Sequence, residues 1–211
     1  MNTFKRISAA VLTLVVVCGA IAGVATIATR RQAEAFLSEL RSTQLGAGGY
    51  ERVKEIATRF RKDVAESGGT CSQSDCTLTV SFENTWLRRL HVATWTKFGA
   101  TLLVRNGQLY HISTGMTLYT RERVIGAETI LSEKTQSSVP TFRVITKRWG
   151  GDNQPWQAIV ELTPQATQRE RETAFAFNLG CLDKLGGCKD SSDLLPPAWR
   201  DNQEHDAMRK P

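Results

Sequence analysis

The longest apolar stretch of the chain lies near its N-terminus. Residues 7–29 form a run of twenty-three residues without a charged side chain. At a rise of about 1.5 Å per residue a helix of this length reaches about 34 Å, slightly more than the roughly 30 Å of hydrocarbon in a bilayer. The run therefore predicts a transmembrane helix that acts as a signal anchor, with residues 1–6 before it.

Two other interpretations of this run stay open. In a cleaved secretory signal the apolar core has only about 7 to 15 residues, and the small-x-small sequence Ala20-Ile21-Ala22 lies inside the run instead of after it. Cys18 would carry lipid in a bacterial lipoprotein, but Val15-Val16-Val17 precedes it without the small residue of such a signal. The uncleaved anchor is the favoured interpretation.

Two stripes with helical spacing follow the run. The first consists of Ala33, Phe36, Leu37 and Leu40. It predicts an amphipathic juxtamembrane helix, and Gly46-Ala47-Gly48-Gly49 after it predicts a hinge, so that helix and hinge occupy residues 30–49. The second stripe consists of Val53, Ile56, Ala57, Phe60 and Val64. It predicts a helix that covers one face of a sheet.

From Thr77 onward the apolar residues recur at every second position, as in half-buried strands. The dipeptide Asn106-Gly107 lies between two such segments and is typical of a type I′ hairpin turn. A further ribbon is predicted from 141–149 paired with 156–163. Consecutive strands with short turns predict an antiparallel sheet.

The C-terminal part is expected to be helical. Thr167 and Glu170 match a capping box, and the stripe after them predicts a helix of about fifteen residues that ends at Gly186-Gly187. The expected architecture is α+β, with an N-terminal transmembrane helix and a single domain at 50–200 in which helices pack an antiparallel sheet. Residues 201–211 are expected to be a flexible tail.

Five cysteines indicate the compartment of the domain. One is Cys18, and the other four form two close pairs, Cys71 with Cys76 and Cys181 with Cys188. Such pairs suit disulfides in an oxidising compartment, whereas their spacing lacks the C-x2-C knuckles of zinc sites. Two local bridges are favoured among the three pairings. The N-terminus is therefore expected in the cytoplasm and residues 30–211 on the periplasmic or cell-surface side.

The charge balance changes this picture little. Without Lys5 and Arg6, 25 basic residues face 21 acidic ones, a net charge of about +4 outside the membrane. No block of like charge is present in the sequence. A mildly basic surface favours loose attraction to anionic lipids or polymers over specific nucleic-acid recognition.

One aromatic and basic cluster is a candidate surface for an anionic ligand. It contains Trp86, Arg88, Arg89, His91, Trp95, Lys97 and Phe98. Indole and guanidinium groups have flat faces that stack on sugars or bases or lie against anionic lipid. The favoured alternative is that the tryptophans are core residues covered by arginine stems. Similarly, His111 is interpreted as a sheet residue and not as a catalyst.

Nucleophile elbows, Walker loops, HExxH zinc helices and calcium loops are absent from the sequence. The sequence therefore predicts no catalytic residue, no cofactor and no metal site. We expect a non-enzymatic binding or accessory module of a bacterial envelope, anchored by a single membrane span, that contacts a protein partner or another envelope component. An envelope hydrolase or transferase with an unrecognised site is the alternative.

Overall fold

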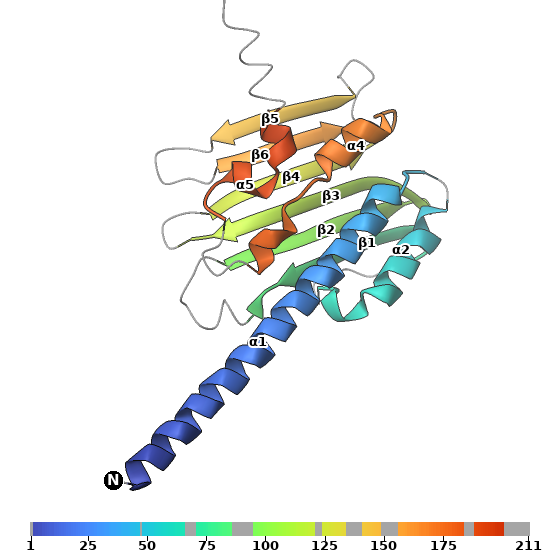
Figure 1. Cartoon of the computed structure of the whole chain (residues 1–211). Coiled ribbons are helices and arrows are strands. Elements are labelled where there is room, and N and C mark those ends of the chain that lie inside the picture. The colour runs from blue at the N-terminus through green and yellow to red at the C-terminus, as the bar shows by residue number, and fades with distance from the viewer. Residues whose placement is uncertain are drawn as a thin grey trace, which may run out of the picture.

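The computed structural model describes residues 2–46, 48–65, 71–85, 95–120, 124–133, 141–148, 156–183 and 188–200. The fold is α+β, as predicted: a six-stranded sheet is packed by helices on one face (Figure 1). Its helical elements are α1 (Asn2–Ser42), α2 (Gly49–Arg59), η1 (Arg61–Asp63), α4 (Gln168–Ala174), η2 (Leu179–Leu182) and α5 (Ser191–Leu194). Its strands are β1 (Asp75–Glu83), β2 (Trp95–Arg105), β3 (Gln108–Tyr119), β4 (Val124–Ser132), β5 (Phe142–Arg148) and β6 (Trp156–Leu162).

The sheet is mixed, which corrects the prediction of an antiparallel sheet. The strand order is β1-β2-β3-β4-β6-β5, and β6 runs parallel to β4 while all other neighbours are antiparallel. The β5–β6 ribbon itself forms as predicted. The order of these two strands in the sheet follows from their composition. Strand β6 buries Ala158, Val160 and Leu162 completely, whereas β5 carries three basic residues and forms the edge of the sheet.

The hairpin between β2 and β3 confirms the prediction from Asn106-Gly107. Both residues have positive φ, 52° and 73°, as the two central positions of a type I′ turn require. Leu102 pairs with Ile112 in the same ladder, whose register shifts only between Leu103 and Val104. The local turn chemistry therefore sets the pairing at the centre of the sheet.

The second half of α1 is part of the hydrophobic core. Ala33, Phe36, Leu37 and Leu40 are at most 3% exposed, and α1 lies across the sheet at its C-terminal end (Figure 1). The Phe36 ring lies 5.1 to 6.4 Å from three other phenylalanine rings, those of Phe60, Phe82 and Phe98. The hydrophobic core of the domain therefore includes part of α1, which lies before the domain boundary predicted at residue 50.

The glycine-rich segment after α1 is fastened to the sheet. Gly46 exchanges two backbone hydrogen bonds with Leu109 of β3, at 2.8 and 3.1 Å. Gly46 and Gly48 have positive φ, which explains why glycine occupies these positions. The predicted hinge is thus a turn that holds the start of α2 against β3.

Helix α4 is shorter than expected. The capping box of Thr167 and Glu170 is present, but the helix ends after seven residues instead of about fifteen. The hydroxyl of Thr129 donates a hydrogen bond to the carbonyl of Ala174, and Arg41 donates one to the carbonyl of Phe175 at 2.7 Å. These side chains satisfy carbonyls at the helix end that a further turn would otherwise use.

The cysteine pairs lie in the favoured local connectivity. Cys71 is bonded to Cys76 and Cys181 to Cys188, with Cα–Cα distances of 4.1 and 5.3 Å. Cys188 thus fastens the segment before α5 to η2, while Cys18 has a free thiol.

Over the residues that the structure describes, none of the helices combines the length and hydropathy of a span. The transmembrane helix at residues 7–29 stays a prediction.

The packing of Phe36 predicts a large effect of its truncation. Phe36→Ala removes a fully buried ring and leaves a cavity, so the free energy of unfolding should fall by about 3 to 5 kcal/mol. Urea denaturation of the full-length protein in a mild detergent measures this change. Gln32→Ala, at an exposed position of the same helix, should change it by less than about 0.5 kcal/mol. An equally small effect of Phe36→Ala would contradict the role of α1 in the core.

Candidate binding trough on the open sheet face

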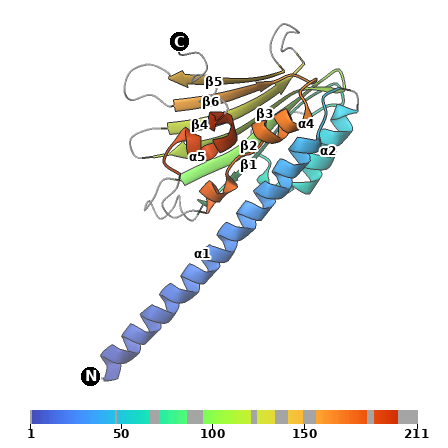
Figure 2. The same cartoon turned by 45° about the horizontal axis from the view of Figure 1, so that its top comes forward.

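The sheet has one face that no described helix covers. Helices α1, α2, α4 and α5 all lie on the other side (Figures 1 and 2). Buried and half-buried residues alternate along β1 to β4 accordingly, because successive side chains of a strand point to opposite faces. The half-buried set forms the open face.

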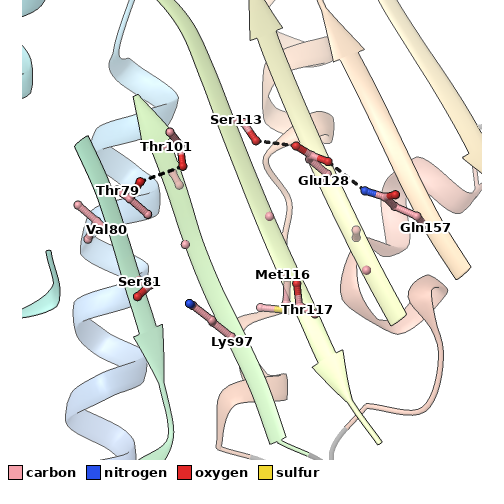
Figure 3. Close-up of a pocket in the computed structure, with 15 residues that line it drawn as sticks. Thr79, Val80, Ser81, Lys97, Thr101, Ser113, Met116, Thr117, Glu128 and Gln157 are labelled. Atoms are coloured by element: carbon pink, nitrogen blue, oxygen red, sulfur yellow. Dashed lines mark hydrogen bonds between the residues drawn. The ribbon is translucent and has the colours of Figure 1, made fainter. Parts of the chain in front are cut away.

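A shallow trough of about 260 Å³ lies on this open face (Figure 3). It crosses β1, β2, β3, β4 and β6 near the middle of the sheet. Besides three glycines and the apolar residues Val80, Ala100, Met116 and Ala127, the trough is lined by polar or charged residues: Thr79, Ser81, Lys97, Thr101, Ser113, Thr117, Glu128 and Gln157. The trough can therefore form many hydrogen bonds with a ligand.

The floor of the trough consists of three glycines. Gly99 pairs directly with Gly115, and Gly126 lies on the next strand. A Cβ atom at Gly99 would lie 2.5 Å from the carbonyl oxygen of Val80, so packing of β1 against β2 requires this glycine. At Gly115 and Gly126 the nearest atoms would be 3.5 and 3.8 Å away, an ordinary contact distance.

Packing within the chain therefore does not explain Gly115 and Gly126. Both have negative φ and lie in regular pairing, where glycine weakens a strand by roughly 0.5 to 1 kcal/mol relative to alanine. Glycine inside a strand often marks a place where a ligand or another backbone approaches closely. The two residues leave the floor free for such an approach.

The carboxylate of Glu128 is held by donors from both neighbouring strands. The Ser113 hydroxyl donates to Oε1 at 2.6 Å, and the Gln157 amide donates to Oε2 at 3.0 Å. Figure 3 shows the three side chains in one line across β3, β4 and β6. Each oxygen keeps lone-pair capacity, so Glu128 is oriented and still able to accept a hydrogen bond from a ligand.

Lys97 supplies the opposite charge at the β2 side of the trough (Figure 3). It lies half-buried across from Thr117. Among the residues that the structure describes, no hydrogen bond or ion pair involves the Lys97 side chain. A cation and a carboxylate thus flank a floor without side chains.

An aromatic pair lies beyond Lys97 on the same face. Trp95 and Tyr119 are directly paired across β2 and β3, and their rings stack at 3.9 Å with an interplanar angle of 7°. Together with the trough they form a surface that is polar in the middle and aromatic at one end.

The aromatic and basic cluster of the sequence analysis is only partly described. Trp95 and Lys97 lie on the open face as candidates for ligand contact, whereas Phe98 is completely buried in the core. Trp86, Arg88, Arg89 and His91 lie outside the described residues. The proposed anionic-ligand surface therefore stays a prediction for its arginines.

Sequence reasoning did not identify Glu128, Ser113 or Gln157. The three lie on three strands, and only the unexpected insertion of β6 beside β4 brings Gln157 next to Glu128. The glycines offered a signal, because Gly99, Gly115 and Gly126 each interrupt an otherwise regular strand pattern.

His111 lies on the open face, half-buried and paired with Ser132 at one side of the trough. Burial lowers its pKa below the ordinary 6.5, and the charge of Glu128 opposes this shift. Its surroundings therefore favour the neutral imidazole.

The described residues contain no group of three or more His, Cys, Asp or Glu side chains that could hold a metal ion.

Comparisons of the chain with known protein families, with curated proteins and with solved structures find no match. An assignment of function therefore depends on the chemistry of the described residues.

The electrostatics of the open face can be tested at His111. Glu128→Gln removes the charge that raises the pKa of His111, so this pKa should fall further below 6.5, as followed by NMR titration of the ring. In the wild type the unfolded chain binds the His111 proton more readily than the folded chain. Its contribution to stability is therefore constant above about pH 6.5 and decreases as the pH falls towards the folded pKa.

Glu172→Gln on α4, an exposed site, is the matched control and should leave the His111 titration unchanged. An unchanged or raised pKa in Glu128→Gln would contradict the coupling of the two side chains.

Proposed function

We propose that this protein is a single-pass, membrane-anchored binding module of a bacterial envelope, whose open sheet face binds a hydroxyl-rich glycan outside the cytoplasm. The observation that carries the proposal is the glycine floor of the trough between Lys97 and Glu128. The proposal contains three parts: an anchor, a compartment and a ligand.

Exposed apolar side chains on α1 support the anchor. Large hydrophobic residues with 48–70% exposure lie along its first part: Leu12, Val16, Val17, Ile21, Val24 and Ile27. In the described remainder of the chain only Val124 is comparable, at 38%. Contiguous exposed apolar surface of this kind marks an interaction with a membrane or another protein, and a span of lipid would cover it all around the helix.

A contact between α1 and the sheet refines the proposed span. The Asn84 amide donates a hydrogen bond to the Thr26 hydroxyl at 2.9 Å and one to the Leu182 carbonyl at 3.2 Å. Because Thr26 is held by the folded domain, the lipid-embedded part ends before it, which leaves Ile27 outside the hydrocarbon. Residues 7–25 still form a helix of about 28 Å, which is close to the hydrocarbon thickness.

The disulfides support the compartment. Two local bridges, Cys71–Cys76 and Cys181–Cys188, persist where thiols are not kept reduced. The bridges therefore support a position of the domain outside the cytoplasm, with residues 1–6 on the cytoplasmic side.

The chemistry of the trough supports a glycan ligand. A sugar hydroxyl both donates and accepts hydrogen bonds, and the trough offers hydroxyls, an amide, a carboxylate and an ammonium group. The floor of Gly99, Gly115 and Gly126 allows a ring to lie close to the backbone. The stacked Trp95 and Tyr119 add an apolar surface next to it. An open trough that crosses five strands suits a polymer better than an enclosed small molecule.

The alternative, an envelope hydrolase or transferase, is favoured by one distance. The hydroxyl of Ser113 lies 2.6 Å from the carboxylate of Glu128, as a nucleophile lies beside its base. However, both residues are in the middle of paired strands, where backbone N–H groups are used in the ladder. The trough therefore has few free amides to stabilise an oxyanion, and binding is the better-supported function.

The glycine floor predicts opposite effects on stability and on binding. In the double variant with Gly115→Ala and Gly126→Ala, both new Cβ atoms meet only ordinary contacts. The free energy of unfolding should rise by roughly 0.5 to 1 kcal/mol per site, whereas affinity for the glycan should fall at least about tenfold. Isolated peptidoglycan and soluble chitotetraose are suitable probes, measured by sedimentation and by calorimetry.

Thr77→Val, on the same face but outside the trough, is the control and should bind as the wild type does. If the double variant bound both probes normally, or if the wild type bound neither, the proposed ligand would be wrong. A glycan-cleaving activity of the wild type that is lost in Ser113→Ala would support the hydrolase.

The proposed topology predicts the side of the membrane on which the C-terminus lies. Alkaline phosphatase, which needs disulfides to be active, should be active when fused after residue 211, and a green fluorescent protein that requires the cytosol should be dark there. The reverse result would contradict both the anchor orientation and the oxidising compartment. Fusion of each reporter after residue 6 serves as the control.

A further inference from the structure

A second cavity lies on the helical side of the sheet, away from the trough. It has a volume of about 690 Å³ and is formed by the C-terminal end of α1 and by α4. These two helix ends lie beside each other in both views (Figures 1 and 2). Its polar lining consists of Ser38, Arg41, Ser42, Gln44, Gln168, Arg171 and Glu172.

Two arginines join the two helix ends reciprocally. Arg41 of α1 donates a hydrogen bond to the carbonyl of Phe175 at the end of α4, at 2.7 Å. Arg171 of α4 donates one to the carbonyl of Thr43 at the end of α1, at 3.2 Å. A guanidinium has five N–H donors, so each side chain uses one donor in this exchange and keeps others.

The charges of these arginines are not neutralised within the described part of the chain. None of the ion pairs there includes Arg41 or Arg171. The Nε atom of Arg171 is buried without a hydrogen-bond acceptor, and burial lowers the pKa of this side chain. The one lining carboxylate, Glu172, accepts a hydrogen bond from Gln168 at 2.9 Å. Arg171 is thus a half-buried cation, and Arg41 an exposed one, that form no ion pair with the described residues.

We propose that this groove, which we call the arginine groove, binds a phosphate group carried by a soluble metabolite or by a polymer of the envelope. Two guanidinium groups from different helices match the several oxygens of a tetrahedral phosphate, which accepts bidentate hydrogen bonds from each. The hydroxyl of Ser38 lies along the same groove and is a further donor, whereas the Ser42 hydroxyl already donates to the carbonyl of Glu39 at 2.9 Å. Bound phosphate would pair with both guanidinium groups, neither of which forms an ion pair with Glu172.

The distance between the arginine groove and the proposed membrane span limits which phosphate groups can reach the groove. Arg41 lies fifteen residues beyond Thr26 on a continuous helix, a distance of about 22 Å along its axis. If α1 is anchored as proposed, the head groups of its own membrane are out of reach. The arginine groove does not otherwise depend on the proposed function of the trough, because it lies on the opposite side of the sheet.

The test uses the full-length protein in a neutral detergent, with inorganic phosphate and a short-chain polyphosphate as probes. Binding is measured by calorimetry and by the concentration-dependent rise of the melting temperature that a ligand of the folded state produces. Ser38→Glu adds a carboxylate at the rim without removing either arginine, and it should weaken binding at least about tenfold. Arg171→Gln should abolish binding.

Gln32→Glu makes the same change of charge at an exposed position of α1 outside the groove, and it should bind phosphate as the wild type does. Binding of both probes would indicate a free phosphate group as the recognised unit, and binding of polyphosphate alone would indicate a polymer. No binding of either probe, or equal weakening in Ser38→Glu and Gln32→Glu, would overturn the proposal. Ser38→Glu should leave glycan binding unchanged, so that the two sites are tested separately.

Discussion

The insertion of Phe36 into a cluster of phenylalanine rings is the contact on which the arrangement depends. It fixes the second half of α1 against the sheet, together with Phe60, Phe82 and Phe98. The first half of the same helix carries the exposed apolar side chains. One continuous element therefore meets two surroundings, a protein core and a surface that only an apolar environment can cover.

This arrangement also determines where ligands have access. Because α1, α2, α4 and α5 all pack on one face, the other face keeps its polar side chains and its glycine floor open to solvent. The helical side has a different chemistry, with Arg41 and Arg171 exchanged between two helix ends. A hydroxyl-rich ligand and a phosphate would thus be bound on opposite sides of the sheet, without competition for the same residues.

Local patterns in the sequence were sufficient for the features that depend on neighbouring residues. Asn106-Gly107 forms its turn, Thr167 and Glu170 form their capping box, and the cysteines pair locally. Contacts between distant segments were not predictable in this way. The place of β6 depends on the burial of Ala158, Val160 and Leu162, the early end of α4 involves Arg41, and the trough brings together residues from five strands. The local signs of the site were Trp95 and Lys97 of the aromatic and basic cluster and the glycines inside strands.

The unbroken course of α1, reinforced where Asn84 holds Thr26, has a mechanical consequence. Gly46, the first glycine after α1, is itself hydrogen-bonded to β3, so the helix and the sheet are connected rigidly. If the anchor and the glycan ligand are as proposed, a pull on the glycan would reach the membrane as torque on the helix. Such a rigid connection would then set the height and tilt of the domain relative to the membrane.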